Sequence, residues 1–173
     1  GPAVPNKIGA IMADLSAQRI EAKLRELKLT LPPAAAPVAN YVPCVVAGNL
    51  LIVSGQLPFG ETGAIDPHHK GKLGGEVNPP EGREAARLCA LNVLAQARTA
   101  LGSLDRVVRV VRLGGFINCR PHFTDLAPVM NGASDLMVDV FGEAGRHARS
   151  TIGVAELPLG AVVEVEAMFE VTP

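Results

Sequence analysis

The chain has 173 residues, which favours a single domain, and 48% of them are hydrophobic against 19% charged. A formal net charge of −1 argues against a dedicated nucleic-acid-binding protein, which would carry a basic stripe, and removes electrostatic attraction to anionic membranes. No apolar run approaches the roughly 20 residues of a membrane span. The mean hydropathy of +0.26 is high for a monomer, so we expect apolar surface to be buried between subunits.

The three cysteines, Cys44, Cys89 and Cys119, are odd in number, far apart and without a CxxC pair. This usage is typical of reduced thiols in a reducing compartment, so we expect a cytoplasmic protein. Residues 1–13 lack the basic start and apolar core of a secretory signal. Because they open on Gly-Pro, we interpret them as a cloning remnant or a disordered arm.

Residues 14–40 predict an N-terminal helix and a proline-rich connection. Asp14 or Ser16 can cap the helix, and three apolar residues then recur at helical spacing. These residues are Ile20, Leu24 and Leu27. Pro32 and Pro33 are expected to stop the helix.

Two short strands are predicted next, at residues 41–47 and 50–54. Gly48-Asn49 between them is typical of a hairpin turn, because both residues tolerate a positive φ. Residues 58–75 are rich in Gly, Pro and His and predict a loop, in which the His68-His69 pair is expected to be solvated.

The strongest helix start lies at Asn78. Pro79 would occupy the first helical position and Glu81 the capping-box position, so a helix is predicted to run to about Leu101 and end at Gly102. Its broad apolar face includes Ala85, Leu88, Cys89, Val93 and Ala97.

The remaining elements are predicted as a strand at 107–118, a helix from 125 to about 141, and strands at 150–155 and 161–171. Apolar and acidic residues alternate along the last strand. One face carries Val163, Val165, Ala167, Phe169 and Val171, and the other carries Val162, Glu164, Glu166, Met168 and Glu170. This order of elements predicts an α+β domain with helices on one face of a mostly antiparallel or mixed sheet.

Four segments of the chain, in this order, carry a resemblance to a known family. They are Tyr41-Val42 with Val53–Pro58, the long helix leading into Leu101–Arg109, the run Gly145–Ser150, and Val154–Pro158 followed by the acidic strand Val163–Ala167. Together they resemble the RidA family, also called YjgF and, in older naming, endoribonuclease L-PSP. The resemblance covers about residues 41–171, and its most specific part is the Ala-Arg-Ser element ahead of the Ala-x-Leu-Pro turn.

The resemblance implies a chorismate-mutase-like domain over residues 41–173 and a homotrimer with sites at the subunit interfaces. It also implies an enzyme that hydrolyses 2-imino acids, or their enamine tautomers, to 2-ketoacids and ammonia. No cofactor or metal is part of that reaction, and the expected partner is a small carboxylate or imine substrate. The helix before Tyr41 is an addition to the short archetype of the family.

Two residues are expected to carry the chemistry. Arg149 matches the family arginine that grips the substrate carboxylate, a task suited to the planar fork of the guanidinium. Glu164 matches the family glutamate that positions and activates the attacking water, as a general base can. Read without the resemblance, Arg149 is an exposed or interface ion-paired arginine and Glu164 belongs to a solvated strand face.

Five further residues match substrate-binding positions of the family. Tyr41 would line the pocket, although core packing is an alternative, and its hydroxyl can donate to a carboxylate or order a water. Ser54 and Gly55 would lie at a strand end beside the pocket, where glycine permits close approach. Asn131 would reach the site from a helix. Thr151 stands where many deaminase members have cysteine, so only a backbone role is carried over.

Some alternatives stay open. The chain replaces a more usual Pro-containing approach to the arginine with Gly145-Arg146-His147, and His147 either edges the pocket or lies on the surface. A trimer that binds a small carboxylate without turnover is the alternative function. An endoribonuclease is disfavoured by the neutral charge and the missing catalytic histidine pair. His68-His69 lacks a third ligand at metal-binding spacing.

Overall fold

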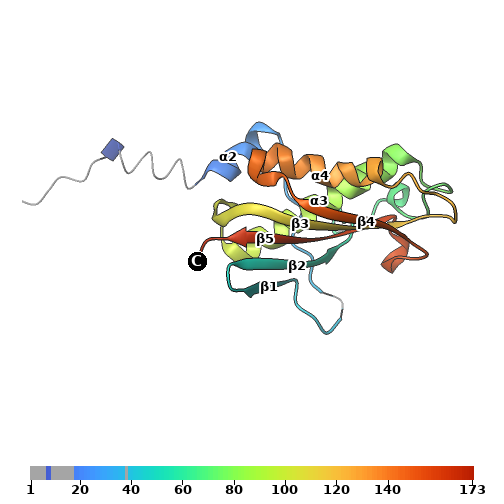
Figure 1. Cartoon of the computed structure of the whole chain (residues 1–173), viewed down its shortest axis with the longest axis horizontal. Helices are drawn as coiled ribbons and strands as arrows, with labels where there is room; N and C mark the ends of the chain where they lie inside the picture. Colours follow the sequence, from blue (N-terminus) through green and yellow to red (C-terminus); the bar gives the residue numbers. More distant parts are fainter. Residues whose placement is uncertain (1–6, 9–17, 38) are drawn as a thin grey trace, which may run out of the picture.

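The computed structural model describes residues 7–8, 18–37 and 39–173. These residues form one sheet with helices on one side of it (Figure 1). The strands are β1 (Cys44–Ala47), β2 (Leu50–Gln56), β3 (Val107–Asn118), β4 (Ala148–Val154) and β5 (Val163–Val171). The helices are α2 (Arg19–Glu26), α3 (Pro79–Leu101) and α4 (Ala127–Phe141).

The five strands lie in the order β1-β2-β5-β3-β4. Neighbouring strands are antiparallel except β3 and β4, which are parallel, so the sheet is mixed as predicted. The core lies between the sheet and the layer of α3 and α4, and α2 packs beside α4 (Figure 1). None of the described helices is long and apolar enough to span a membrane.

The strongest local signals are confirmed. The Asn78 side chain accepts from the Glu81 amide at 2.9 Å, and the Glu81 side chain accepts from the Asn78 amide at 3.1 Å, which completes the capping box of α3. Gly102 ends α3 with a φ of 81°, and Gly48 turns the β1–β2 hairpin with a φ of 62°. On the predicted α3 face, Leu88 is only half-buried.

The N-terminal helix is shorter than predicted. It ends at Glu26 rather than at the prolines, because Lys28 adopts a positive φ of 56° and turns the chain. Asp14 and Ser16 lie outside the described residues. The amide of Ile20, in the first turn, donates to Oδ1 of Asp105 at 2.9 Å, so a residue distant in sequence satisfies this helix end.

Several other element boundaries are corrected. β1 begins at Cys44 rather than Tyr41, since Pro43 has no N–H to donate to a sheet. β2 continues past Ser54 to Gln56, α4 begins at Ala127, and the last two strands are β4 and β5 as bounded above. The loop at 58–75 contains a 3₁₀ turn, Pro67–His69.

The histidine pair is not solvated as a unit. His68 is exposed and its Nδ1 lies 2.9 Å from Oδ1 of Asp66, whereas His69 is buried. The carbonyl of His69 accepts from the amide of Val162, which holds this turn against the start of β5. The prediction was therefore wrong for His69.

Candidate functional site

The two predicted catalytic residues lie on opposite faces of the sheet. Arg149 on β4 pairs with Leu113 on β3, and Leu113 pairs with Ala167 on β5, so all three side chains point to the helix-covered face. Glu164 alternates with the buried residues of β5 and therefore points to the other face. Within one chain, the guanidinium and the carboxylate cannot act on the same small molecule.

The guanidinium of Arg149 is held by the start of α4. Its Nη1 donates to Oδ1 of Asn131 at 2.7 Å and to Oγ of Ser134 at 3.0 Å, and its Nη2 donates to the carbonyl of Ala127 at 3.4 Å. Asn131 and Ser134 share one helix face because they are three residues apart. Among the described residues, no acidic side chain forms an ion pair with Arg149, which leaves its positive charge available for an anion.

The structure adds Ser134 and His147 to this arginine cluster. Oγ of Ser134 lies 2.8 Å from Nε2 of His147, and Nδ1 of His147 lies 2.6 Å from the carbonyl of Gly145. Burial lowers the pKa of His147, the hydrogen bond to the Gly145 carbonyl partly opposes this, and the charge of Arg149 adds a smaller lowering. His147 is thus half-buried beside Arg149 rather than on the surface. Ser134 was missed by sequence reasoning, although its spacing from Asn131 is a signal that could have found it.

Thr151 lies on the same strand face as Arg149, two residues further along β4. Its Oγ1 is buried and has no hydrogen-bond partner within the described part of the chain. The paired residue on β3 is Gly115, where an added Cβ would collide with the Met130 side chain of α4. The strand and helix therefore approach closely beside Thr151, which leaves little room for side-chain rearrangement.

Three of the other predicted residues line one cavity of about 390 Å³, a size suited to a small molecule. They are Tyr41, Gly55 and Glu164. Most of the remaining lining is apolar and includes Leu57, Phe59, Pro158 and Leu159. The cavity therefore combines one carboxylate, one phenol and the amides of Gln56 and Gln96 with an apolar wall.

The backbone of β2 comes close to the carboxylate of Glu164. A Cβ at Gly55 would lie 2.7 Å from Oε2 of Glu164, so only glycine leaves this carboxylate in place. Gly55 lies within an irregularity of the β2–β5 register, between Val53 and Gln56. Burial, and secondly the neighbouring Glu166, raise the pKa of Glu164 above its ordinary value, which makes it a stronger base.

Ser54 does not line this cavity. Its hydroxyl donates to the carbonyl of Val42 at 2.7 Å and so fastens the segment that carries Tyr41. A buried amide, Gln96 of α3, fastens the same wall further along: its Nε2 donates to the carbonyl of Ala35 at 2.7 Å and to Oε1 of Gln56 at 3.3 Å. Sequence reasoning missed Gln96 because nothing local marks a helix glutamine as the anchor of a distant loop.

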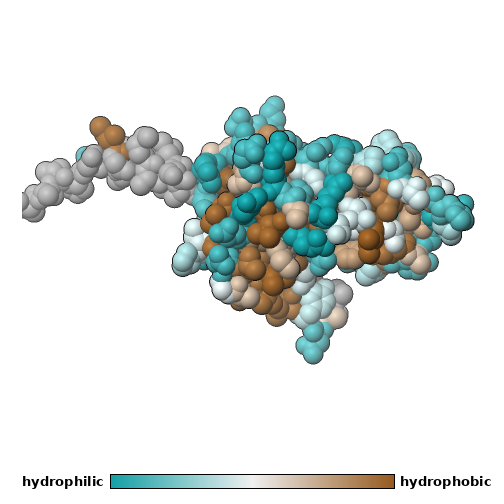
Figure 2. Space-filling model, in the orientation of Figure 1, coloured by the Kyte–Doolittle hydropathy of each residue, from teal (hydrophilic) through white to brown (hydrophobic). Residues whose placement is uncertain are grey.

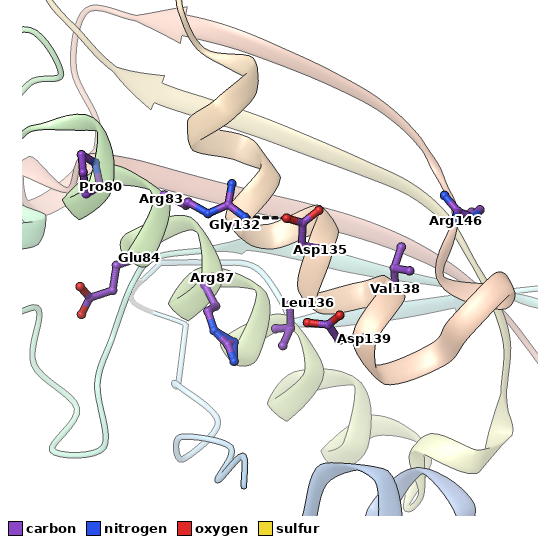
Figure 3. Close-up of a pocket in the computed structure, with 10 residues that line it drawn as sticks. All are labelled: Pro80, Arg83, Glu84, Arg87, Gly132, Asp135, Leu136, Val138, Asp139 and Arg146. Atoms are coloured by element: carbon purple, nitrogen blue, oxygen red, sulfur yellow. Dashed lines mark hydrogen bonds and ion pairs between the residues drawn. The ribbon is translucent and has the colours of Figure 1, made fainter. Parts of the chain in front are cut away.

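A surface groove between α3 and α4 contains none of the predicted site residues (Figure 3). Arg83 of α3 reaches across to Asp135 of α4 and forms an ion pair at 2.5 Å. The lining alternates guanidinium and carboxylate groups, so no single charge dominates. Among the described residues, no group of three or more His, Cys, Asp or Glu side chains is arranged to hold a metal ion.

Comparison with known proteins gives the family. The model described as "YjgF/chorismate_mutase-like, putative endoribonuclease" matches residues 21–171. The chain belongs to the YjgF/RidA family. The fold agrees with this family: the crystal structure of the YjgF gene product from E. coli matches with a TM-score of 0.57 at 26% identity, covering 81% of this chain and 93% of its own.

Three YjgF/RidA relatives illustrate its range. Protein TCP17 of Trypanosoma cruzi is 51% identical over 160 residues, covering 92% of this chain and 98% of its own. A protein named 2-iminobutanoate/2-iminopropanoate deaminase from Dermatophagoides farinae is 29% identical, covering 81% and 92%. The crystal structure of Atu1372 from Agrobacterium tumefaciens, a protein of unknown function, is 45% identical with a TM-score of 0.81, covering 91% and 96%.

Proposed function

We propose that this protein is a cofactor-free hydrolase that converts reactive 2-imino acids, or their enamine tautomers, to 2-ketoacids and ammonia. The observation that carries the proposal is the Arg149 guanidinium, which neutral groups hold in place and no described acid neutralises. Such a group suits the carboxylate shared by all 2-imino acids. A relative named as an imine deaminase supports the same reaction. The free thiols suit a cytoplasmic location.

The active site would be formed by two copies of the chain in a homotrimer. Arg149, Asn131 and Thr151 would come from one protomer, and the cavity of Tyr41, Gly55 and Glu164 from its neighbour. The opposite directions of Arg149 and Glu164 support this division. The sheet face that carries Glu164 is not covered by the described helices, so it is free to meet another subunit (Figure 1).

In the proposed reaction, Arg149 clasps the carboxylate and fixes the imine carbon against a water held by Glu164. Glu164 takes a proton from this water as its oxygen bonds to the imine carbon, the electrons of the C=N bond move to nitrogen, and Glu164 passes that proton to the nitrogen. Glu164 then moves the hydroxyl proton to nitrogen. The carbonyl forms, the C–N bond breaks, and ammonia leaves with a 2-ketoacid as the other product.

The test is ketoacid release from 2-aminoacrylate generated in situ. The wild-type protein is expected to release ketoacid faster than buffer does, and Arg149→Ala or Glu164→Gln is expected to remove the excess. Arg87→Ala, in the groove between α3 and α4, is the matched control and should keep it. If wild type and Arg149→Ala behave alike, the proposal fails.

A carboxylate-binding trimer without turnover is the alternative outcome of the same assay. The unpaired charge of Arg149 favours carboxylate binding whether or not chemistry follows. Calorimetry with 2-ketobutyrate or benzoate separates the two functions. Binding that depends on Arg149, in a protein that does not accelerate imine hydrolysis, would replace the hydrolase by a binding protein.

A further inference from the structure

We infer that His147, acting through Ser134, is a positioning residue that turns one particular edge of the Arg149 guanidinium toward the substrate. The inference rests on the proposed function for the identity of the anion. It assigns a role to two side chains that the proposed reaction does not use. It also predicts which nitrogens of Arg149 make the clasp.

The direction of every hydrogen bond in the cluster follows from one carbonyl. The oxygen of Gly145 can only accept, so Nδ1 of His147 must carry the proton at a separation of 2.6 Å. In the neutral ring, Nε2 is then an acceptor, and the Ser134 hydroxyl donates to it at 2.8 Å. A lone pair of the Ser134 oxygen is thereby left to accept from Nη1 of Arg149 at 3.0 Å.

This chain of bonds occupies both hydrogens of Nη1. One goes to Ser134 and the other to Oδ1 of Asn131. The opposite edge of the guanidinium, formed by Nε and Nη2, has only the long 3.4 Å contact from Nη2 to the Ala127 carbonyl within the described residues. A carboxylate can therefore be clasped at two points only along the Nε–Nη2 edge. His147 and Ser134 fix that choice by keeping Nη1 engaged.

The arrangement requires an uncharged His147. Protonation would make Nε2 a donor, so the Ser134 hydroxyl would lose its acceptor and could turn away from its present direction. The charged groups around the ring are Arg149 on β4, the Arg146–Glu143 pair on the preceding turn, and Arg109 of β3, which donates to the Arg146 carbonyl. An anion on Arg149 would offset the charge that lowers the pKa of His147, so ligand binding should raise this pKa.

The first test uses the wild-type protein and nitrogen-15 NMR of the histidine side chains. We expect the Nδ1-protonated neutral tautomer for His147, and a rise in its pKa when benzoate is added. His68, which is exposed and bonded to Asp66, is the internal control and should not respond to benzoate. An Nε2-protonated ring, or a pKa unchanged at saturating benzoate, would overturn the inference.

The second test separates positioning from folding. Ser134→Ala and His147→Ala should raise the KM for the imine, or the Kd for benzoate, about tenfold with kcat nearly unchanged. Ser134→Thr retains the hydroxyl and should restore binding, while His68→Ala should match wild type. Wild-type KM values in Ser134→Ala and His147→Ala, with Arg149→Ala still inactive, would refute the inference alone. Indistinguishable wild type and Arg149→Ala would refute the proposed function as well.

Discussion

At the scale of single residues, a methyl group added at Gly55 tests the position of the Glu164 carboxylate. An alanine Cβ would lie 2.7 Å from Oε2 of Glu164, so the carboxylate must move. We expect Gly55→Ala to lower kcat/KM by about 100-fold, the effect of a misplacement near 1 Å. Gly114→Ala is the matched control, since its Cβ would meet Oε1 of the exposed Glu166 at the same 2.7 Å. Equal losses in both variants would contradict a catalytic Glu164.

The raised pKa of Glu164 has consequences for pH dependence. Because burial favours the neutral acid, ionisation of Glu164 costs stability as pH rises from the ordinary value of 4.5 through the raised folded pKa, and the cost persists above it. Glu164→Gln should therefore gain thermal stability relative to wild type at pH 7 but not at pH 4. As the pH is lowered, activity should be lost with a midpoint above pH 4.5, because the proposed reaction needs ionised Glu164. A melting-temperature difference that is the same at both pH values would contradict this assignment.

At the scale of secondary-structure elements, the capping box stabilises the start of α3, the longest of the described helices, which packs against the sheet. Asn78→Ala removes the acceptor for the Glu81 amide and should lower the free energy of unfolding by about 1 kcal/mol. Glu81→Gln retains an oxygen that can accept from the Asn78 amide and should cost much less. Urea midpoints of the two variants provide the measurement, and a loss in Glu81→Gln as large as that in Asn78→Ala would argue against the box.

The elements also show what sequence can predict. Signals carried by neighbouring residues, such as the Asn78 box or the Gly48 turn, were predicted correctly because their physics is local. The irregularity at Gly55 and the burial of His69 depend on contacts made only after folding. Those features could not be derived from the local pattern.

The candidate site likewise contains residues that could be predicted from the sequence and residues that could not. Alternation along β5 placed Glu164 on the face away from the core, and family resemblance selected Arg149. The direction of Arg149 depends on the parallel register between β3 and β4, which no local pattern specifies. Gln96 joins its partner across 61 residues, so only the fold brings it to the site, whereas Ser134 could have been found from its helical spacing to Asn131.

At the scale of the whole molecule, the exposed apolar residues suit an assembly. Figure 2 shows apolar side chains gathered over the β1–β2 hairpin, where Val45 and Val46 are 49% and 60% exposed. Ile152 of β4, at the other edge of the sheet, is 50% exposed. Surface of this kind is costly for a monomer and is normally covered by another subunit. The proposed site, with Arg149 and Glu164 on opposite faces, would need such an assembly to bring the two residues together.

Mixed oligomers would test this division directly. Each proposed site takes Arg149 from one protomer and Glu164 from the next. Inactive Arg149→Ala chains and inactive Glu164→Gln chains are therefore co-expressed in equal amounts. The mixture should regain about a quarter of the wild-type sites, because an interface combines the two intact halves with that probability. Mixing Arg149→Ala with the double variant supplies no intact arginine and should regain nothing. Mass spectrometry would show whether mixed oligomers form. If they form and the first mixture is still inactive, Arg149 and Glu164 do not act together in one shared site.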